Sequence, residues 1–361
     1  MDDAANRSAL RRVIASAVVA ALVAAALVMV INSRRAPSAG RSFAETRSLL
    51  STDVTLTVVA PDEPTARAHL AAGFDRIVAL DAVLSAHRPD SELARLNAEA
   101  AEKPVAVSED LFRVVETGVA MNSRTHGAFD IAVAPLLDLW RTCGRQNRLP
   151  SDEELAATLP LIGAGRIRLA PSARTIRFPA DGMRLDLGGL GKGYCADEVA
   201  RLLVKRGVKD ALVSMSGDIH ALGRRENGLH WRVGIQDPRK PDSPDAIITV
   251  LELSDRGVST SGNYQRFVTI GGRRYSHIVD PRTGRTAESV PSVTVIAENT
   301  LTTDIMDTAL DVLGVQEGLA VLKGMPGVEA MFITFDANNE PIITRTAGFS
   351  KYESLQTATH K

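Results

Sequence analysis

The chain has little cysteine and almost no net charge, and both shortages exclude classes of protein. Its 361 residues include two cysteines, Cys143 and Cys195, too few for a disulfide scaffold or a cysteine zinc cluster. The formal net charge is -1. A nucleic-acid-binding protein usually carries a basic patch, and none stands out, so we expect no nucleic-acid partner.

Charge is also absent from one long apolar run, 13–31, whose only polar residue is Ser16. At ~1.5 Å per residue, a helix of this length spans the ~30 Å hydrocarbon layer. We therefore predict a membrane anchor or signal segment at 1–32 and a flexible tether at 33–49. A buried core helix, the alternative, would need polar interruptions. Arginines flank both ends of the run, so charge alone does not set its orientation.

From residue 50 onward, β-branched runs alternate with apolar residues at helical spacing. The patterns predict helices at 65–84, 108–124, 151–159, 196–206, 302–313 and 315–322, and strands at 54–60, 167–169, 175–178, 211–216, 231–235, 247–253, 257–261, 266–270, 275–279, 290–297, 330–334 and 342–344. Neighbouring strands joined by short turns predict antiparallel pairing, with helices on one face of the sheet. The fold class is thus α+β, with a folded domain at 50–347 and a tail at 348–361.

The stretch Leu185–Asp197 reads LDLGGLGKGYCAD and concentrates four glycines around Lys192. Bare backbone of this kind can approach a phosphate closely. The P-loop pattern is missing, because a glycine and not Ser or Thr follows Lys192, and the spacing is not GxGxxG either. A tight strand-to-helix turn without a ligand remains the alternative reading.

Two further stretches carry oxygen and nitrogen ligands. Asp304 and Thr308 are four residues apart on a predicted helix, so they share a face, and Asp307 adds a third oxygen donor. Mg²⁺ favours such ligands, although an aspartate also suits the start of a helix. His277 precedes a Pro-x-x-Gly turn that offers Arg282 and Thr283 as anion-binding groups, whereas a lone strand histidine is usually structural.

Together these stretches form part of six blocks that resemble the FAD:protein FMN transferases, the ApbE-type family. In order, the blocks are LSAHRPDSELARLN, GAFDIAVAPLLDLW, LDLGGLGKGYCAD, SGNY, SHIVDPRTG and TDIMDTAL. They extend over the chain from residue 50 to about 344. The resemblance implies an ApbE-like (T-fold-type) arrangement of antiparallel sheets with helices packed on one face.

The resemblance also implies a set of site residues. Mg²⁺ ligands map to Asp304, Thr308, Asp307 and the backbone carbonyl of Gly189, and the histidine implicated in catalysis maps to His277. Positions that contact FAD map to Ala128, Phe129, Asp130, Asp186, Lys192 and Ile278, together with His87.

Three positions depart from the family pattern. His87 stands where an aromatic residue, often Tyr, commonly meets the flavin. The usual MGT is Leu50-Ser51-Thr52, and the usual AGGD is Met215-Ser216-Gly217-Asp218, which keeps only the Gly-Asp. None of these changes removes a metal ligand or His277.

The resemblance implies that the enzyme takes FMN from FAD, attaches it through a phosphoester to a Thr or Ser of a target flavoprotein, and releases AMP. An Mg²⁺-dependent FAD pyrophosphatase and a non-catalytic, membrane-tethered FAD-binding protein are the alternatives. The expected partner is the FMN-acceptor domain of a membrane redox complex subunit. The expected location is the cytoplasmic (inner) membrane, with one span and the catalytic domain on the periplasmic or extracytoplasmic side.

Overall fold

The computed structural model describes residues 40–243, 245–262, 267–288 and 290–354. None of the helices formed by these residues is both long and apolar enough to cross a membrane. The predicted anchor at 1–32 and the first part of the predicted tether, 33–39, lie outside the described residues.

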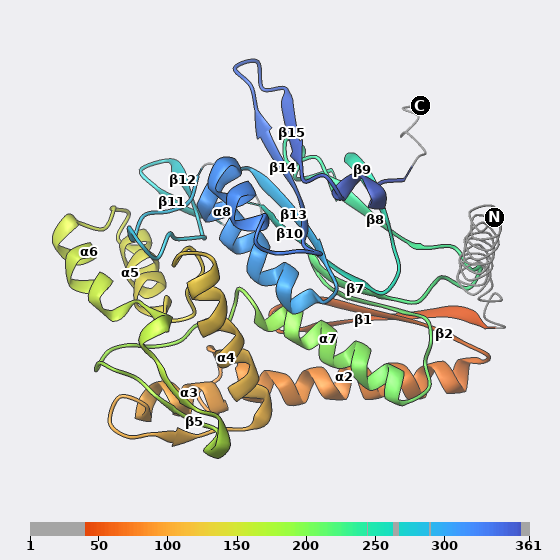
Figure 1. Cartoon of the computed structure of the whole chain (residues 1–361), viewed down its shortest axis with the longest axis horizontal. Coiled ribbons are helices and arrows are strands. Elements are labelled where there is room, and N and C mark those ends of the chain that lie inside the picture. Colours follow the sequence, from red (N-terminus) through yellow and green to blue (C-terminus); the bar gives the residue numbers. More distant parts are fainter. Residues whose placement is uncertain (1–39, 244, 263–266, 289, 355–361) are drawn as a thin grey trace, which may run out of the picture.

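An antiparallel sheet of eight strands forms the centre of the described chain, in the order β1-β2-β6-β7-β10-β13-β14-β15 (Figure 1). The strands are β1 (Arg41–Leu49), β2 (Thr52–Ala60), β6 (Ala211–Met215), β7 (Asp218–Leu222), β10 (Arg256–Gly262), β13 (Ser292–Ala297), β14 (Glu329–Phe335) and β15 (Pro341–Arg345). Every residue of β13 is buried, as expected for a strand covered on both faces.

Three long helices cover one face of this sheet (Figure 1). They are α2 (Glu63–Leu84), which packs on β2, α7 (Gly191–Lys205), which packs on β6 and β7, and α8 (Thr300–Leu322), which packs on β10 and β13. Asn299 caps α8 by accepting a hydrogen bond from the backbone N–H of Thr302. Gly314 divides α8 into two helical parts because its φ is 72°.

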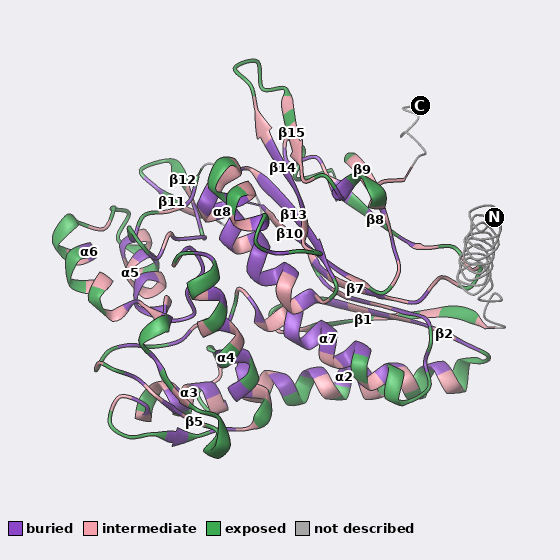
Figure 2. Ribbon diagram, in the orientation of Figure 1, coloured by how far each residue is buried: buried purple, intermediate pink, exposed green. Residues whose placement is uncertain are grey.

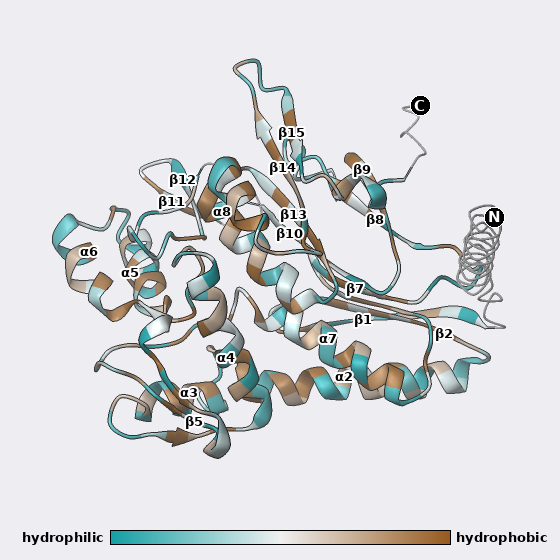
Figure 3. Ribbon diagram, viewed as in Figure 1, coloured by the Kyte–Doolittle hydropathy of each residue, from teal (hydrophilic) through white to brown (hydrophobic). Residues whose placement is uncertain are grey.

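Alternation along the strands divides the hydrophobic core between the two faces of the sheet. In β14, Phe332 joins the cluster under the helices, whereas Met331 and Ile333 join a second cluster on the opposite face. The hairpin β8 (Trp231–Gln236) and β9 (Ile247–Leu253) contributes to this second cluster and covers it. Figure 2 shows buried residues concentrated along the central strands of the large sheet, and Figure 3 shows hydrophobic residues along the same strands.

The remaining elements gather at one end of the sheet, on the left of Figure 1. They are α3 (Glu92–Glu99), α4 (Glu109–Arg124), α5 (Ala134–Arg145), α6 (Asp152–Thr158), a small sheet of β3 (Val105–Ala106), β4 (Arg168–Ala170) and β5 (Thr175–Arg177), and the hairpin β11 (Phe267–Ile270) with β12 (Arg273–Ser276). Four short 3-10 turns lie at Leu159–Leu161, Ala164–Arg166, Pro171–Ala173 and Phe349–Tyr352. The hairpin packs on α5, where Trp140 and Ile270 belong to a third hydrophobic cluster.

Much of the predicted secondary structure is confirmed. The helices predicted at 65–84 and 108–124 are α2 and α4, the strand at 54–60 lies within β2, and the pair at 167–169 and 175–178 forms an antiparallel hairpin. The helices predicted at 302–313 and 315–322 are the two parts of α8. All ladders of the described residues are antiparallel, as predicted.

Four boundaries were predicted wrongly. The tether does not extend to residue 49, because Arg41–Leu49 is strand β1 and pairs along its whole length with β2. The predicted tail at 348–361 does not begin at residue 348, since Phe349 is fully buried and Glu353 bridges to Leu251, and residues 355–361 lie outside the described residues. The helix predicted from Ala196 begins at Gly191, and the strand predicted at 275–279 ends at Ser276.

Candidate active site

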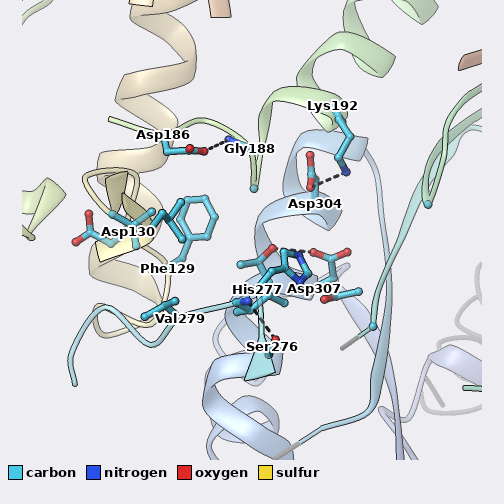
Figure 4. Close-up of a pocket in the computed structure, with 18 of the residues that line it drawn as sticks. Phe129, Asp130, Asp186, Gly188, Lys192, Ser276, His277, Val279, Asp304 and Asp307 are labelled. Carbon is cyan, nitrogen blue, oxygen red and sulfur yellow. Dashed lines mark hydrogen bonds and ion pairs between the residues drawn. The ribbon is translucent and has the colours of Figure 1, made fainter. Parts of the chain in front are cut away.

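One pocket of about 470 Å³ lies where the large sheet, α7 and α8 meet the elements at the end of the sheet. This volume is typical of small-molecule sites. The residues that the family resemblance assigns to the metal, to FAD and to catalysis all line it: His87, Ala128, Phe129, Asp130, Asp186, Gly189, Lys192, His277, Ile278, Asp304, Asp307 and Thr308. Figure 4 shows several of these side chains facing a common space, although they come from distant parts of the chain.

Helix α8 brings two carboxyl groups and a hydroxyl to the pocket. Asp304 and Asp307 are buried, with relative exposures of 3% and 4%. The Thr308 hydroxyl donates to Oδ1 of Asp307 over 3.3 Å. Because Asp304 and Thr308 are one helical turn apart, the three oxygen-bearing side chains form one acidic wall.

The glycine stretch lies against this wall. Gly188 donates its N–H to Oδ1 of Asp186 over 2.8 Å, which fixes the turn before α7. A Cβ atom on Gly189 would lie 3.2 Å from the Phe129 ring and 3.5 Å from the Thr308 hydroxyl oxygen. The backbone of Gly189 therefore lies close to the Phe129 ring and to Thr308.

Helices α7 and α8 are joined closely at their first turns. The N–H of Gly193 donates to Oδ2 of Asp304 over 2.8 Å. A Cβ atom on Gly193 would lie only 2.4 Å from the carbonyl oxygen of Thr300, so only glycine fits there without a shift of the backbone. Asp197 accepts hydrogen bonds from the backbone N–H groups of Thr300 and Leu301 and so anchors the start of α8.

The acidic wall carries more negative charge than its surroundings neutralise. Burial, followed by repulsion from Asp218, raises the pKa of Asp304 to about 7. Burial and the charges of Asp218 and Asp304 likewise raise the pKa of Asp307 well above its ordinary value. Carboxyl groups in this condition favour a bound cation, because a cation removes the penalty of ionising them.

Lys192 is the cation that the described chain places at this wall. Its ammonium pairs with Oδ2 of Asp218 and lies 3.7 Å from Oδ1 of Asp304. Burial alone would lower the pKa of Lys192, but attraction to Asp218 and Asp304 outweighs it, and the pKa is raised. The family resemblance maps Lys192 to an FAD contact, whereas Asp218 was not among the predicted site residues, although the Gly-Asp pair that contains it was noted.

His277 lies just after β12 with an exposed side chain, and Ile278 beside it is buried. The N–H of Ile278 donates to the Ser276 hydroxyl over 3.1 Å, which shapes this turn. Arg282 does not line the pocket. Its guanidinium pairs with Asp280 at 2.9 Å and lies 3.5 Å from Glu317, so the predicted anion-binding role of the turn is not supported for this side chain.

Asp130 lies on the pocket wall, but its carboxylate is engaged in holding the backbone. It accepts hydrogen bonds from the N–H groups of Ala132 and Ala164 and from the Asn122 amide. Figure 4 shows the carboxylate pointing away from the Phe129 ring. Burial raises the pKa of Asp130. The acid therefore shapes the turn that presents Ala128 and Phe129 to the pocket.

Part of the pocket lining is apolar. Val133, Leu137 and Trp140 of the α5 region line it together with Val268 of β11. The Trp140 indole N–H donates to the carbonyl oxygen of Gly284 over 2.8 Å, which fixes the ring. An apolar lining suits a flat ring system, whereas the acidic wall would repel a phosphate unless a cation bound between them.

No three His, Cys, Asp or Glu side chains converge as a ready-made metal site in the described parts of the chain. The predicted ligand set does not require them, since it combines Asp304 and Asp307 with the Thr308 hydroxyl and the backbone of Gly189. From the predicted SGNY block, Ser261 and Gly262 line the pocket, whereas residues 263 and 264 lie outside the described residues.

Comparison with known proteins gives one consistent answer. The model of the ApbE family matches residues 50–332. The chain is 35% identical over 264 residues to the FAD:protein FMN transferase of Escherichia coli, covering 72% of this chain and 74% of that protein. It is 35% identical over 286 residues to the FAD:protein FMN transferase of Treponema pallidum, covering 75% and 78%. The crystal structure of Pseudomonas stutzeri flavinyl transferase ApbE, apo form, superposes with a TM-score of 0.76 and 31% identity, covering 87% and 97%.

Proposed function

The chain belongs to the ApbE family and is an FAD:protein FMN transferase, and we propose that it attaches FMN to a threonine or serine of its target flavoprotein with the help of Mg²⁺. The acceptor hydroxyl oxygen attacks the FMN-side phosphorus of FAD. A new phosphorus–oxygen bond forms, the bond to the bridging oxygen breaks, and AMP leaves with that oxygen.

One observation carries this proposal. The buried carboxyl groups of Asp304 and Asp307 lie beside Thr308 and Gly189 in a single pocket, and burial and the charge of Asp218 raise both pKa values. Such a wall is costly to the protein unless a cation binds there. A purely structural role for these residues would not offset the cost of burying and ionising two neighbouring carboxyl groups.

These residues fit Mg²⁺ by their chemistry. Asp304, Asp307 and Thr308 would supply hard oxygen ligands, with the backbone carbonyl of Gly189, and substrate oxygens or waters would complete the set. When bound, Mg²⁺ neutralises negative charge on the diphosphate and on the departing AMP.

The remaining residues hold and orient the substrate. The start of α7 lies at the pocket with Gly189 and Lys192, where the helix dipole favours an anion. The Lys192 ammonium adds a fixed positive charge there. His277, exposed at the pocket, is the group we assign to accept the proton of the attacking hydroxyl.

The test is to measure AMP and free FMN after incubating the full chain with FAD and Mg²⁺, with and without an FMN-acceptor domain. The proposal predicts AMP release that requires the acceptor, with little free FMN. Equal amounts of AMP and FMN without an acceptor would identify an FAD pyrophosphatase. Bound but intact FAD in both samples would identify an FAD-binding protein without catalysis.

The apolar run at 13–31 supports a further part of the proposal, that the enzyme is tethered to the cytoplasmic membrane with its catalytic domain outside the cytoplasm. There it would act beside the FMN-acceptor domain of a membrane redox complex. Fractionated cells should hold the full chain in the membrane and release it only with detergent, and protease added to spheroplasts should digest it. A chain found in the soluble fraction, or one protected from the protease, contradicts this placement.

A further inference from the structure

Asp218 is a buried carboxylate at the pocket that neither the predicted metal ligands nor the predicted FAD contacts include. It begins β7, just after the turn Ser216-Gly217, and it is 2% exposed. Its backbone is fixed on both sides, because it pairs with Met215 of β6 and with Ser259 of β10. Its side chain therefore has little freedom to follow a moving partner.

The partner of Asp218 is Lys192, which lies on a different element. The Lys192 ammonium contacts Oδ2 of Asp218, while Oδ1 of Asp304 is 3.7 Å away. The ammonium is thus held between a carboxylate that we do not assign to the metal and one that we do. The charge of Asp307 also attracts this ammonium. When ionised, the three carboxylates and the one ammonium together carry a net charge of about -2, which one divalent cation would neutralise.

This arrangement creates a competition for Asp304. An ammonium and a divalent cation both favour the same carboxylate oxygens, and the side chain of a lysine is long and flexible. With its other partner removed, the ammonium would settle on Asp304 and Asp307, where attraction is strongest. It would then occupy the space of the metal and leave the phosphates without a positive charge.

We propose that Asp218 is a positioning residue that holds the Lys192 ammonium away from the metal ligands, so that lysine and Mg²⁺ occupy separate places at the same acidic wall. This inference rests on the proposed function, because it takes Asp304 and Asp307 as the ligands of Mg²⁺. Asp218 itself touches neither metal nor substrate in this account. It acts only through Lys192.

The test is a double-mutant cycle on Mg²⁺ binding, measured by calorimetry on the full chain in detergent without FAD. The four proteins are the wild type, Asp218→Asn, Lys192→Met and the double variant. Asp218→Asn removes a negative charge whether or not Lys192 is present. A purely long-range electrostatic effect would therefore weaken Mg²⁺ binding equally with and without Lys192. If Asp218 acts through Lys192, the loss is larger by about tenfold when Lys192 is present.

Two other outcomes are possible, and they contradict different claims. Equal losses of Mg²⁺ affinity in the two backgrounds overturn the positioning role of Asp218 and leave the metal site intact. A wild-type chain that binds no Mg²⁺ overturns the proposed metal site and, with it, this inference. Asp218→Ser serves as a second variant if Asp218→Asn melts at a lower temperature than the wild type, and it should show the same dependence on Lys192.

Discussion

Asp304 and Thr308 are two residues whose place in the site could be predicted from the sequence. Their spacing of four on an apolar-periodic segment predicts a shared face, and the structure places both in the pocket. Asp218 was missed because a Gly-Asp pair after a strand is ordinary turn chemistry. Its role depends on its contact with Lys192, which is distant in sequence, and a local sequence pattern cannot predict such a contact.

His277 gives a prediction at the level of one side chain. His277→Ala should bind FAD as the wild type does, because the residue lies at the exposed edge of the pocket and supports no buried contact that we assign to FAD. Transfer of FMN should slow by roughly 10²–10⁴-fold, as expected when a general base is lost. Fluorescence quenching of FAD and the rate of AMP release measure the two effects. An unchanged rate removes His277 from the proton transfer.

The turn between β1 and β2 gives a second prediction at this scale. Leu50 and Ser51 both have positive φ, 54° and 57°, in a two-residue hairpin turn that favours glycine. Ser51→Gly should raise the free energy of unfolding by about 1 kcal/mol, because a left-handed conformation strains residues with a Cβ. Urea denaturation measures the change.

Ser48→Gly is the matched control for this turn. Ser48 is equally exposed but lies inside strand β1, where glycine is expected to lower stability by about 0.5–1 kcal/mol. If both substitutions shift stability in the same direction, strain at residue 51 is not the cause.

At the level of elements, the close contact of α7 with α8 positions the acidic wall. The sequence predicts both helices, but it places the start of α7 at Ala196, since glycines disfavour helix. The helix begins at Gly191, because Gly193 allows its first turn to approach Thr300 and Asp304. Strand β1 was missed for another reason: most of its residues are exposed on this edge strand, so no apolar alternation marks it.

Two glycines of α7 form a matched pair for testing this contact. Gly193→Ala should destabilise the protein by about 1–3 kcal/mol, because its Cβ would meet the Thr300 carbonyl oxygen at 2.4 Å. Gly191→Ala should be neutral or stabilising by up to about 1 kcal/mol, since no atom lies within 4 Å of its Cβ. Thermal melting of both variants checks the prediction. If both variants are destabilised equally, the close contact at Gly193 does not limit how closely α7 and α8 pack.

For the whole molecule, the α+β class, the antiparallel pairing and the helix-covered face were all predicted from the order of strand and helix patterns. The path of the sheet was not, because the neighbours β2 and β6 are separated by the whole segment from α2 to α7. His87, Asp186 and Asp304 are likewise far apart in the sequence, and the fold brings them together in the pocket. Local periodicity carries no information on such distant pairings.

The acidic wall makes the stability of the metal-free protein depend on pH. The pKa of Asp304 is raised to about 7 from an ordinary value near 3.8, and that of Asp307 is raised as well. The folded state therefore holds protons that the unfolded state releases. These groups contribute most stability below pH 4, and the contribution is lost as the pH rises through 7.

In EDTA, the melting temperature of the wild type should thus fall between pH 5 and pH 8 more steeply than that of Asp307→Asn, which removes one of the two carboxyl groups. Added Mg²⁺ should stabilise the wild type more at pH 8 than at pH 6, since the ligands must lose their protons to bind it. If the melting temperatures of the two proteins fall equally between pH 5 and pH 8, the raised pKa values assigned to Asp304 and Asp307 are contradicted.

The most direct test of the account is the intact mass of an FMN-acceptor domain after incubation with the full chain, FAD and Mg²⁺. The account predicts that the acceptor gains the mass of one phosphoester-linked FMN on a threonine or serine. The gain should disappear when EDTA replaces Mg²⁺ and when Asp307→Asn replaces the wild type. An acceptor of unchanged mass in the complete mixture, with the chain folded and FAD bound, would contradict the central claim.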